Sequence, residues 1–397
     1  MKQGWEIKKL IDVCVVERGS SPRPIKNFIT ASIDGVNWIK IGDTKTVDKY
    51  IYSTKEKITK EGAEKSRYVK KGDFILSNSM SFGKPFIMKT DGYIHDGWFV
   101  LRLYDFIDTE YFFQLLSSPY VNDQFHKLAS GAVVKNISGD LVKKVVLPIP
   151  PLPEQKRIIA ILDKAFIILS KAKANAEQNL KNAKELFESY LQGVFENKEK
   201  GWEEKKLNEI TEVKDGTHDS PKYIKDGIPF VTQKNIKPDG LTIKKNTKFI
   251  TAIDHLKFYK RSNVAYGDIL ISMIGANRGM TCIVDDKRIF SIKNVGLIKK
   301  SENINQFFLL YYLQSKLAMK YVKEMSNGGA QEFVGLRALR AFPIPFPKDV
   351  QIQKQIVKKL DAISAETKKL GAIYQQKIDD LEELKKSVLQ KAFNGEL

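Results

Sequence analysis

Residues 4–10 read Gly4-Trp5-Glu6-Ile7-Lys8-Lys9-Leu10, and residues 201–207 read Gly201-Trp202-Glu203-Glu204-Lys205-Lys206-Leu207. One heptapeptide pattern therefore opens two segments that lie 197 residues apart. A repeat at a fixed spacing indicates the number and size of the structural units before any helix or strand is assigned.

Further matched pairs follow in the same order along the chain. Residues 19–22 match 216–221, 72–77 match 267–272, 112–113 match 307–308, 148–150 match 343–345, 155–156 match 353–354, and 185–195 match 383–393. The offset stays between 195 and 199 residues throughout. An ordered series at one offset indicates a duplication, and the period is too long for a solenoid repeat. We therefore predict two copies of a globular unit that ends in a tail.

The first part of each copy has mixed α and β character. Short β-rich runs stand between Gly, Asn and Ser clusters, and two stretches carry apolar residues at helical spacing. Pro-rich segments at 148–153 and 343–347 can continue neither a helix nor a central strand, so they end each globule. The β-rich runs are 38–41, 74–76, 98–101, 269–271 and 281–284, and the helical stretches are 109–116 and 305–325. We predict α+β globules over residues 1–150 and 201–346.

The second part of each copy, residues 151–200 and 347–397, predicts a long helix. Apolar residues alternate at spacings of four and three, which is a coiled-coil seam. Asn179 and Lys377 are polar residues at matching positions of the two seams. They either fix the register of the helix pair or face solvent at a point where the seam loosens. The predicted core residues are Ile158, Leu162, Leu169, Leu186, Tyr190, Ile356, Leu360, Ile363, Leu370, Leu381, Leu384 and Val388.

Chain geometry predicts that the two helices pair antiparallel. A helix of about 40 residues is about 60 Å long at 1.5 Å per residue. The intervening globule has a radius of gyration of about 15 Å, which is too small to return the chain for a parallel pair. The predicted fold class is therefore α+β, with two homologous α/β globules separated by a long antiparallel two-helix coiled coil and an internal pseudo-two-fold.

The composition favours a polyanionic partner. Sixty-six Lys and Arg against forty-seven Asp and Glu give a net charge of +19, and cationic side chains that neutralise phosphates release condensed counterions. The alternative is a basic protein that binds no polyanion. Cys14 and Cys282 fall in apolar segments, which favours buried thiols in a reducing compartment. No apolar run reaches eighteen residues and the N-terminus lacks a signal-peptide pattern, so we expect a cytoplasmic protein with no membrane contact.

Motifs for catalysis do not emerge from the sequence. The chain has no Asn-Pro-Pro or Asp-Pro-Pro before an aromatic residue, as amino-methyltransferases have. Gly83-Lys84 lacks the flanking residues of a phosphate-binding loop. The four histidines, His95, His126, His218 and His255, have no partner at metal-ligand spacing. We therefore expect neither a catalytic site nor a metal site in this chain.

Loops of the two globules carry the residue types that read and hold DNA. Asn and Gln can bond adenine, Arg can bond guanine, and Lys and Ser can hold phosphates. Ordinary turn chemistry also places Ser, Asn and Gly in loops. Because the loops differ between the globules, a DNA site would be bipartite and asymmetric. The candidate DNA-binding residues are Ser20, Arg23, Lys26, Asn78, Ser79, Ser81, Lys84, Lys135, Thr217, His218, Ser220, Lys222, Gln233, Lys234, Asn235, Asn277, Arg278, Lys293 and Gln331.

Taken together, the matched motifs resemble those of specificity subunits of type I restriction–modification enzymes. They are the Gly-Trp…Lys-Lys-Leu openings, the Gly-Asp-Phe/Ile segments, Pro-Ile-Pro…Gln-Lys…Leu-Asp and the C-terminal residues 384–397. The resemblance covers essentially the whole chain and includes the loop that ends in Gln331.

The resemblance implies a non-catalytic subunit with two target-recognition domains, whose helices act as a ruler along double-stranded DNA. It also implies two docked adenine methyltransferase subunits and ATP-dependent restriction subunits, with S-adenosylmethionine, ATP and Mg²⁺ bound by those partners. A competing hypothesis is a coiled-coil scaffold whose globules bind proteins. Salt distinguishes the two, because DNA binding weakens steeply as the salt concentration rises.

Overall fold

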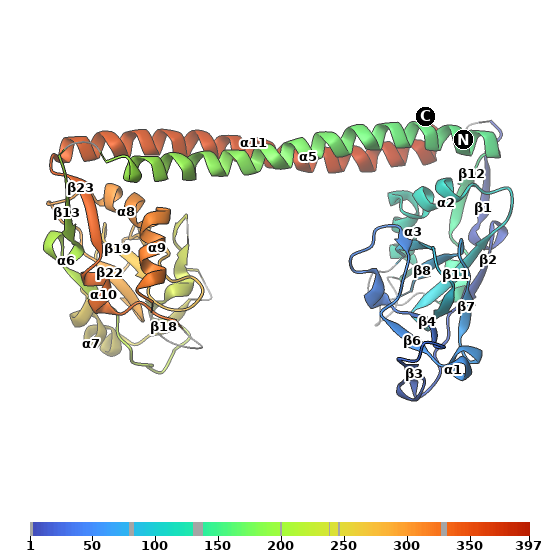
Figure 1. Ribbon diagram of the computed structural model, residues 1–397, viewed down its shortest axis with the longest axis horizontal. Coiled ribbons are helices and arrows are strands. Elements are labelled where there is room, and N and C mark those ends of the chain that lie inside the picture. Colours follow the sequence, from blue (N-terminus) through green and yellow to red (C-terminus); the bar gives the residue numbers. More distant parts are fainter. Residues whose placement is uncertain are drawn as a thin grey trace. The chain divides into compact units, whose positions relative to one another are not determined.

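Two compact units make up the chain in the computed structural model, which describes residues 3–78, 83–129, 138–198, 201–237, 239–244, 247–326 and 332–397. The first unit comprises Met1–Glu177 and Gln376–Leu397, and the second comprises Gln178–Gln375. Each unit contains one mixed α/β globule and part of both long helices (Figure 1). The predicted α+β duplication is therefore confirmed.

The globule of the first unit is built on two five-stranded sheets and one two-stranded ribbon. Its helices are α1 (Lys60–Glu64), α2 (Thr109–Leu116), α3 (Pro119–Ala129) and α4 (Gly139–Val142), with 3-10 turns η1 (Leu10–Asp12), η2 (Ile25–Asn27) and η3 (Ile41–Thr44). One sheet has the strand order β2 (Cys14–Arg18), β11 (Trp98–Leu103), β8 (Phe74–Ser77), β9 (Pro85–Met88), β5 (Tyr50–Ile51). The other sheet has the order β3 (Ile29–Thr30), β6 (Glu56–Ile58), β4 (Val36–Ile39), β10 (Gly92–Ile94), β7 (Arg67–Val69). The ribbon pairs β1 (Glu6–Lys9) with β12 (Val146–Ile149).

The globule of the second unit repeats this plan, but its two main sheets have four and three strands. Its helices are α6 (Leu207–Ile210), α7 (Ala252–Ser262), α8 (Gln306–Gln314), α9 (Lys316–Glu324) and α10 (Leu336–Arg340), with the 3-10 turn η4 (Gln233–Asn235). The four-stranded sheet has the order β14 (Val213–Asp215), β22 (Val295–Ile298), β19 (Ile269–Ser272), β20 (Thr281–Ile283). The three-stranded sheet has the order β18 (Lys248–Ile250), β15 (Ile228–Val231), β21 (Ser291–Ile292). Two ribbons pair β13 (Trp202–Lys206) with β23 (Pro343–Pro347), and β16 (Ile236–Lys237) with β17 (Gly240–Leu241).

The Pro-rich segments form one strand of a two-stranded ribbon in each globule. β12 pairs with β1, and β23 pairs with β13, in both cases antiparallel. Proline is tolerated there because a ribbon of two strands has no central position. The matching heptapeptides at 4–10 and 201–207 are therefore the partner strands that tie the start of each globule to its end.

The predicted helix over residues 305–325 is interrupted in the structure. α8 ends at Gln314 and α9 begins at Lys316, because the Ser315 side chain accepts a hydrogen bond from the Ala318 amide and caps the second helix. The matching aromatic pair is also shifted. Asp108 and Asn305 occupy the same N-cap position, so Tyr111, and not Phe113, corresponds to Phe308.

A buried glutamine joins each globule to its long helix. Gln155 is fully buried, donates through Nε2 to the Pro150 carbonyl at 2.9 Å, and accepts from the Asp108 amide at 2.7 Å. Gln353 repeats this arrangement with the Pro347 carbonyl and the Asn305 amide. The repeated Gln-Lys motif therefore has a structural role at the joint.

The two long helices, α5 (Leu152–Glu196) and α11 (Val350–Asn394), pair antiparallel within each unit. In the first unit the start of α5 (Ile158, Leu162) shares a core with the end of α11 (Ala392, Phe393). In the second unit the end of α5 shares a core with the start of α11, including Leu360. The predicted antiparallel pair is confirmed.

Four residues predicted in the seam are exposed instead: Leu186 (56%), Tyr190 (36%), Leu370 (38%) and Leu384 (48%). Beyond Ala183 the buried face of α5 moves by one residue, to Phe187, Leu191 and Phe195. An α-helix drifts about 20° per heptad from a 3.5-residue repeat. At this end the buried face of α5 also meets α8, because Phe195 contacts Phe308 at 5.4 Å between ring centroids.

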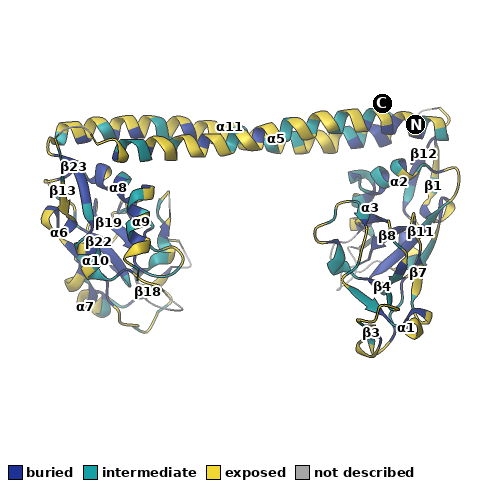
Figure 2. Cartoon of the chain, in the orientation of Figure 1, coloured by how far each residue is buried: buried dark blue, intermediate teal, exposed yellow. Residues whose placement is uncertain are grey.

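The remaining predicted seam residues lie on the buried side of their helices. Ile158, Leu162 and Leu360 are fully buried, and the others are half-buried: Leu169, Ile356, Ile363, Leu381 and Val388. Figure 2 shows that most of the surface of both long helices is exposed, whereas burial concentrates in the sheets of each globule. Lys377 is exposed, which favours a solvent-facing role over one that fixes the register.

Candidate nucleic-acid interface

Each globule contains a cleft at the same place in its fold. In the first globule β4 pairs in parallel with β10, and in the second β15 pairs in parallel with β21. Parallel strands end at the same edge, so the residues that follow them come together, as in many ligand-binding sites of α/β proteins. We call the two hollows the first cleft and the second cleft.

The first cleft has a volume of about 750 Å³ and lies beside the loop that follows β2. Most of its apolar wall comes from Pro22, Pro24, Ile25 and Trp38. Its polar residues are Ser21, Arg23, Lys26, Lys40, His95 and Asp96. Two of the predicted DNA-binding residues, Arg23 and Lys26, therefore line this cleft, and both are exposed.

Asp96 organises the polar side of the first cleft. Its carboxylate accepts a hydrogen bond from Ser21 Oγ at 3.0 Å and one from Arg23 Nη2 at 2.9 Å. Partial burial raises the pKa of Asp96, but the Ser21 hydrogen bond and the neighbouring charges of His95 and Arg23 outweigh burial, so its pKa lies below the ordinary value. The carboxylate is thus held charged, and it reduces the positive charge that Arg23 presents.

His95 is nearly enclosed by the backbone around the first cleft. Its Nδ1 faces the Gly97 amide at 2.7 Å and its Nε2 faces the Ile41 amide at 3.2 Å. Burial lowers the pKa of His95 below its ordinary value, although Asp96 acts in the opposite direction. A neutral imidazole accepts at one nitrogen, so either tautomer satisfies one of the two amides.

Three other predicted residues of the first globule have structural contacts outside the cleft lining. Asn78 is buried and donates through Nδ2 to the Asp96 carbonyl at 2.8 Å, which holds the loop after β10. Ser20 Oγ donates to the Lys65 carbonyl at 3.1 Å. Lys84 is exposed, with its Nζ 5.1 Å from the centre of the Phe86 ring. Ser79, Ser81 and Lys135, like Gln331 of the second globule, lie outside the described residues.

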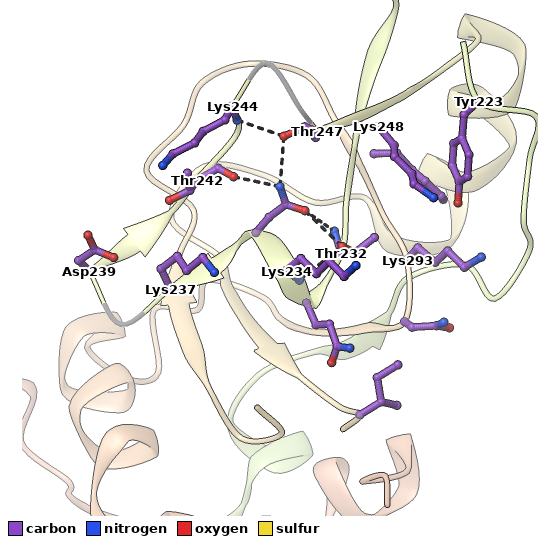
Figure 3. A pocket seen from close by; sticks show the side chains of 15 residues that line it. Tyr223, Thr232, Lys234, Lys237, Asp239, Thr242, Lys244, Thr247, Lys248 and Lys293 are labelled. Carbon is purple, nitrogen blue, oxygen red and sulfur yellow. Dashed lines mark hydrogen bonds between the residues drawn. The ribbon is translucent and has the colours of Figure 1, made fainter. Parts of the chain in front are cut away.

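The second cleft has a volume of about 780 Å³ and is strongly cationic (Figure 3). Among the residues that the structure describes, five lysines line this cleft and one carboxylate does, that of Asp239. The lysines are Lys234, Lys237, Lys244, Lys248 and Lys293. Such a concentration of ammonium groups attracts a polyanion, and several phosphates spaced along a strand can engage several lysines together.

Asn235 has a structural role beneath the second cleft. Its Oδ1 accepts from the Thr232 amide at 2.9 Å, and its Nδ2 donates to the Thr242 carbonyl at 3.0 Å and to Thr247 Oγ1 at 3.3 Å. Thr232 Oγ1 lies 3.3 Å from the same Oδ1. These contacts use the hydrogen-bonding capacity of the amide, so Asn235 shapes the cleft wall.

The loop after β14 contacts two lining residues of the second cleft, Lys293 and Asn294, which follow β21. Lys293 Nζ donates to Ser220 Oγ, and His218 Nδ1 lies 2.7 Å from Asn294 Oδ1. Behind them, the buried carboxylate of Asp215 accepts two hydrogen bonds from Arg261, both at 2.9 Å.

The other candidates of the second globule are divided between its surface and its interior. Gln233, Lys234 and Asn235 join Lys293 in lining the cleft, Thr217 is buried, and Lys222 and Asn277 are exposed. Arg278 forms an ion pair with Glu332 and donates to Ser326 Oγ at 2.8 Å, which leaves 18% of its side chain exposed. Its guanidinium is therefore already engaged within the globule.

Several lining residues were not predicted from the sequence. In the second cleft these include Tyr223 and Lys248, whose ammonium lies 4.0 Å from the centre of the Tyr223 ring. Figure 3 shows this pair at one side of the cleft. In the first cleft they include Trp38 and His95. Nothing in a Lys-rich sequence marks one lysine as a cleft residue; only the pairing of β15 with β21 could have drawn attention to this edge.

Within the described parts of the chain, no three His, Cys, Asp or Glu side chains are grouped as a metal site would require. Among the helices that the structure describes, none has the length and apolar character to span a membrane.

The fold and its clefts thus define a duplicated protein with two related, differently charged clefts. The chain belongs to the family of the type I restriction modification DNA specificity domain, which matches residues 2–181 and again residues 199–380. Both copies of the repeat are therefore copies of this domain.

Curated relatives are specificity subunits of type I restriction enzymes. That of EcoBI from Escherichia coli is 25% identical over 295 residues, covering 68% of this chain and 62% of the relative. That of MjaIX from Methanocaldococcus jannaschii is 27% identical, covering 64% and 63%. The match thus spans less than two thirds of the length of these relatives. The putative MjaX subunit of the same organism is 26% identical and is covered to 94%, with all of this chain aligned.

Solved structures share the fold. A chain from a study of complex assembly and conformational transition of the type I R-M system aligns over 100% of this chain and 99% of its own, with a TM-score of 0.80 and 22% identity. The HsdS subunit from Thermoanaerobacter tengcongensis aligns over 100% and 98%, with a TM-score of 0.60 and 22% identity. At this identity the likeness establishes the fold alone.

Proposed function

We propose that this chain is the DNA-specificity subunit of a type I restriction–modification complex. Each globule reads one half of a bipartite, asymmetric site in double-stranded DNA. The observation that carries the proposal is the pair of clefts at the same strand ends, similar in volume and different in lining. Equivalent positions with unlike side chains suit two half-sites of unlike sequence.

The long helices supply the spacing and the docking surface in this proposal. The ruler comprises residues 151–200 and 347–397, and the recognition domains comprise residues 1–150 and 201–346. Two methyltransferase subunits bind the helices, and restriction subunits with translocase activity join that core. The exposed apolar residues of the helices, such as Ile167 and Ile168 at 69% and 67% exposed, are compatible with burial by a partner.

The chain itself does no chemistry in this proposal. S-adenosylmethionine, ATP and Mg²⁺ bind to the partner subunits, as the resemblance to specificity subunits implies. The lack of amino-methyltransferase and phosphate-loop motifs in this sequence agrees with that assignment. The complex works on chromosomal DNA in the cytoplasm.

Co-expression with the methyltransferase partner tests the proposal. Genome-wide mapping of methylated adenines should reveal one bipartite motif that is absent from cells without this chain. Replacing residues 1–150 by a homologous globule should change one half of the motif and leave the other half intact. A change in both halves, or in neither, contradicts the assignment of one globule to each half-site.

The ruler has a separate test. Removing one heptad from each helix shortens the pair by about 10 Å. The unspecified spacer of the methylated motif should then change, or binding should be lost. An unchanged spacer contradicts a measuring role for the helices.

A further inference from the structure

Gln233 lines the second cleft, and a hydrogen bond anchors its side chain. It is the first residue of η4, and its Oε1 accepts a hydrogen bond at 3.2 Å from Ser272 Oγ, a side chain that is 1% exposed. Gly275 adds no contact that could orient the amide, because even a Cβ at that position would stand 3.8 Å from Nε2 and 3.9 Å from Oε1. The hydrogen bond from Ser272, the last residue of β19, thus anchors the Gln233 side chain beside the cleft.

Gln233 retains hydrogen-bonding capacity that its neighbour Asn235 lacks. A carboxamide has two N–H donors and two acceptor sites on its oxygen. In Gln233 the Ser272 hydroxyl occupies one acceptor site, and Nε2 has no partner among the residues that the structure describes. A donor and an acceptor therefore remain available side by side.

We propose that Gln233 is a specificity-determining residue that reads an adenine in the half-site bound by the second globule. The major-groove edge of adenine presents an acceptor, N7, beside a donor, the N6 amino group, and a glutamine amide can bond both. Guanine presents two acceptors there, so only Nε2 of Gln233 could bond that edge, and the available acceptor site of Oε1 would face another acceptor. This inference rests on the proposed function.

The lysines that line the cleft would position the DNA backbone for this base contact. Lys234 follows Gln233 in the chain, and Lys248 and Lys293 also line the cleft. Phosphate contacts position a protein on DNA, whereas contacts to base edges specify the sequence. The five lysines thus hold the backbone while Gln233 contacts a base.

The first experiment uses the unaltered chain with its methyltransferase subunits. After methylation mapping has given the motif, each adenine of the two half-sites is replaced in turn by 7-deazaadenine, which lacks only the N7 acceptor. Binding should weaken roughly tenfold at one adenine outside the methylated position, because a bidentate base contact contributes about 1–3 kcal/mol of discrimination. If no adenine shows a loss, the inference is wrong.

The second experiment couples that adenine to Gln233. The Gln233→Ala variant should bind the natural and the 7-deazaadenine duplex equally, and its methylated motif should become permissive at that single base pair. Lys234→Ala is the matched control from the next residue. It should weaken binding to both duplexes alike and leave the motif unchanged.

The outcomes separate this inference from the proposed function. If the unaltered complex methylates a bipartite motif but Gln233→Ala leaves every position of that motif as strict as before, only the role of Gln233 is wrong. If Gln233→Ala does not fold, Gln233→Glu takes its place, because a carboxylate can still accept from Ser272 Oγ but has no donor for N7. A Gln233→Glu complex that still distinguishes the natural duplex from the 7-deazaadenine duplex shows that the role of Gln233 is wrong. If the unaltered complex shows no salt-dependent DNA binding, the proposed function itself fails.

Discussion

The two clefts differ more in charge than in position. Both lie where two parallel strands end, and Trp38 of β4 takes the place that Phe230 of β15 takes, since each belongs to the parallel pair of its globule. The side chains that line the two clefts differ beyond that position. The first cleft is largely apolar and contains the Arg23–Asp96 ion pair, whereas five of the described lysines line the second. The buried strands thus keep the same scaffold in both copies, while the residues after the strand ends differ.

The difference in charge gives the largest expected effect. Replacing Lys234, Lys248 and Lys293 together by Ala should make the plot of the logarithm of the DNA-binding constant against the logarithm of salt concentration less steep. The size of its negative slope should fall by about 3, since each phosphate contact contributes about 0.9. Affinity at physiological salt should fall by about two orders of magnitude. Filter binding or fluorescence anisotropy over a salt series measures both quantities.

The first cleft supplies the comparison for that measurement. Lys26→Ala with Lys40→Ala should reduce the size of the slope by about 1 or less, because Lys40 already pairs with Glu56 and leaves Lys26 as the main contributor. An equal loss of slope per lysine in the two clefts would contradict the proposed asymmetry.

The ion pairs behind the clefts should differ in their contribution to stability. Asp215 is 7% exposed and receives two hydrogen bonds from Arg261, so Asp215→Asn should lower the free energy of unfolding by about 2–3 kcal/mol. Asp96 is 45% exposed and its partner Arg23 is 79% exposed, so Asp96→Asn should lower it by less than about 1 kcal/mol. Urea unfolding monitored by intrinsic fluorescence distinguishes the two.

A matched control lies in the same globule. Asp219 pairs with Lys257 on α7, as Asp215 pairs with Arg261, but both side chains are more than half exposed. Asp219→Asn should change the free energy of unfolding by about 0.5 kcal/mol or less. A loss equal to that of Asp215→Asn would show that burial is not the cause.

The amides that donate to backbone carbonyls should have a smaller, local effect. Asn78→Ala and Asn235→Ala each remove hydrogen bonds to backbone carbonyls, so each should destabilise its own unit by about 1–2 kcal/mol. Hydrogen exchange followed by mass spectrometry should place the lost protection in the first unit for Asn78 and in the second for Asn235. Protection lost in both units by either change would contradict this local role.

The smallest expected effect is a pH dependence of stability. Burial lowers the pKa of His95 in the first globule and of His255 in the second. The unfolded chain therefore binds more protons than the folded chain below about pH 6.5, and stability should decrease as the pH falls through this range. His95→Gln should flatten this dependence for the first unit, as followed by thermal unfolding between pH 7.5 and 5.5.

His255→Gln is the counterpart of that variant in the second unit. It should flatten the pH dependence of the second unit and leave that of the first unit unchanged. A slope that persists in full after His95→Gln would assign the effect to another group.

Much of the architecture could be predicted from the sequence, because it depends on local rules. The repeat at one offset predicted two like globules, and the apolar spacing predicted two long helices whose connection requires antiparallel pairing. The seam was predicted correctly at Leu162 and Leu360, where each helix has a regular core. It was wrong at Leu186, because contact with α8 turned the buried face, and such a contact is not encoded in the period of the helix.

The duplication, the mixed globules, the paired helices and the surplus of positive charge follow from the amino-acid sequence alone. Which polar side chains remain available to a ligand depends on the folded arrangement. Asn78, Asn235 and Gln233 are alike as loop amides in the sequence, yet the first two donate to backbone carbonyls, whereas Nε2 of Gln233 has no partner among the described residues. Hydrogen-bond partners far apart in the chain determine whether an amide is used internally or can bind a ligand, and no local pattern records them.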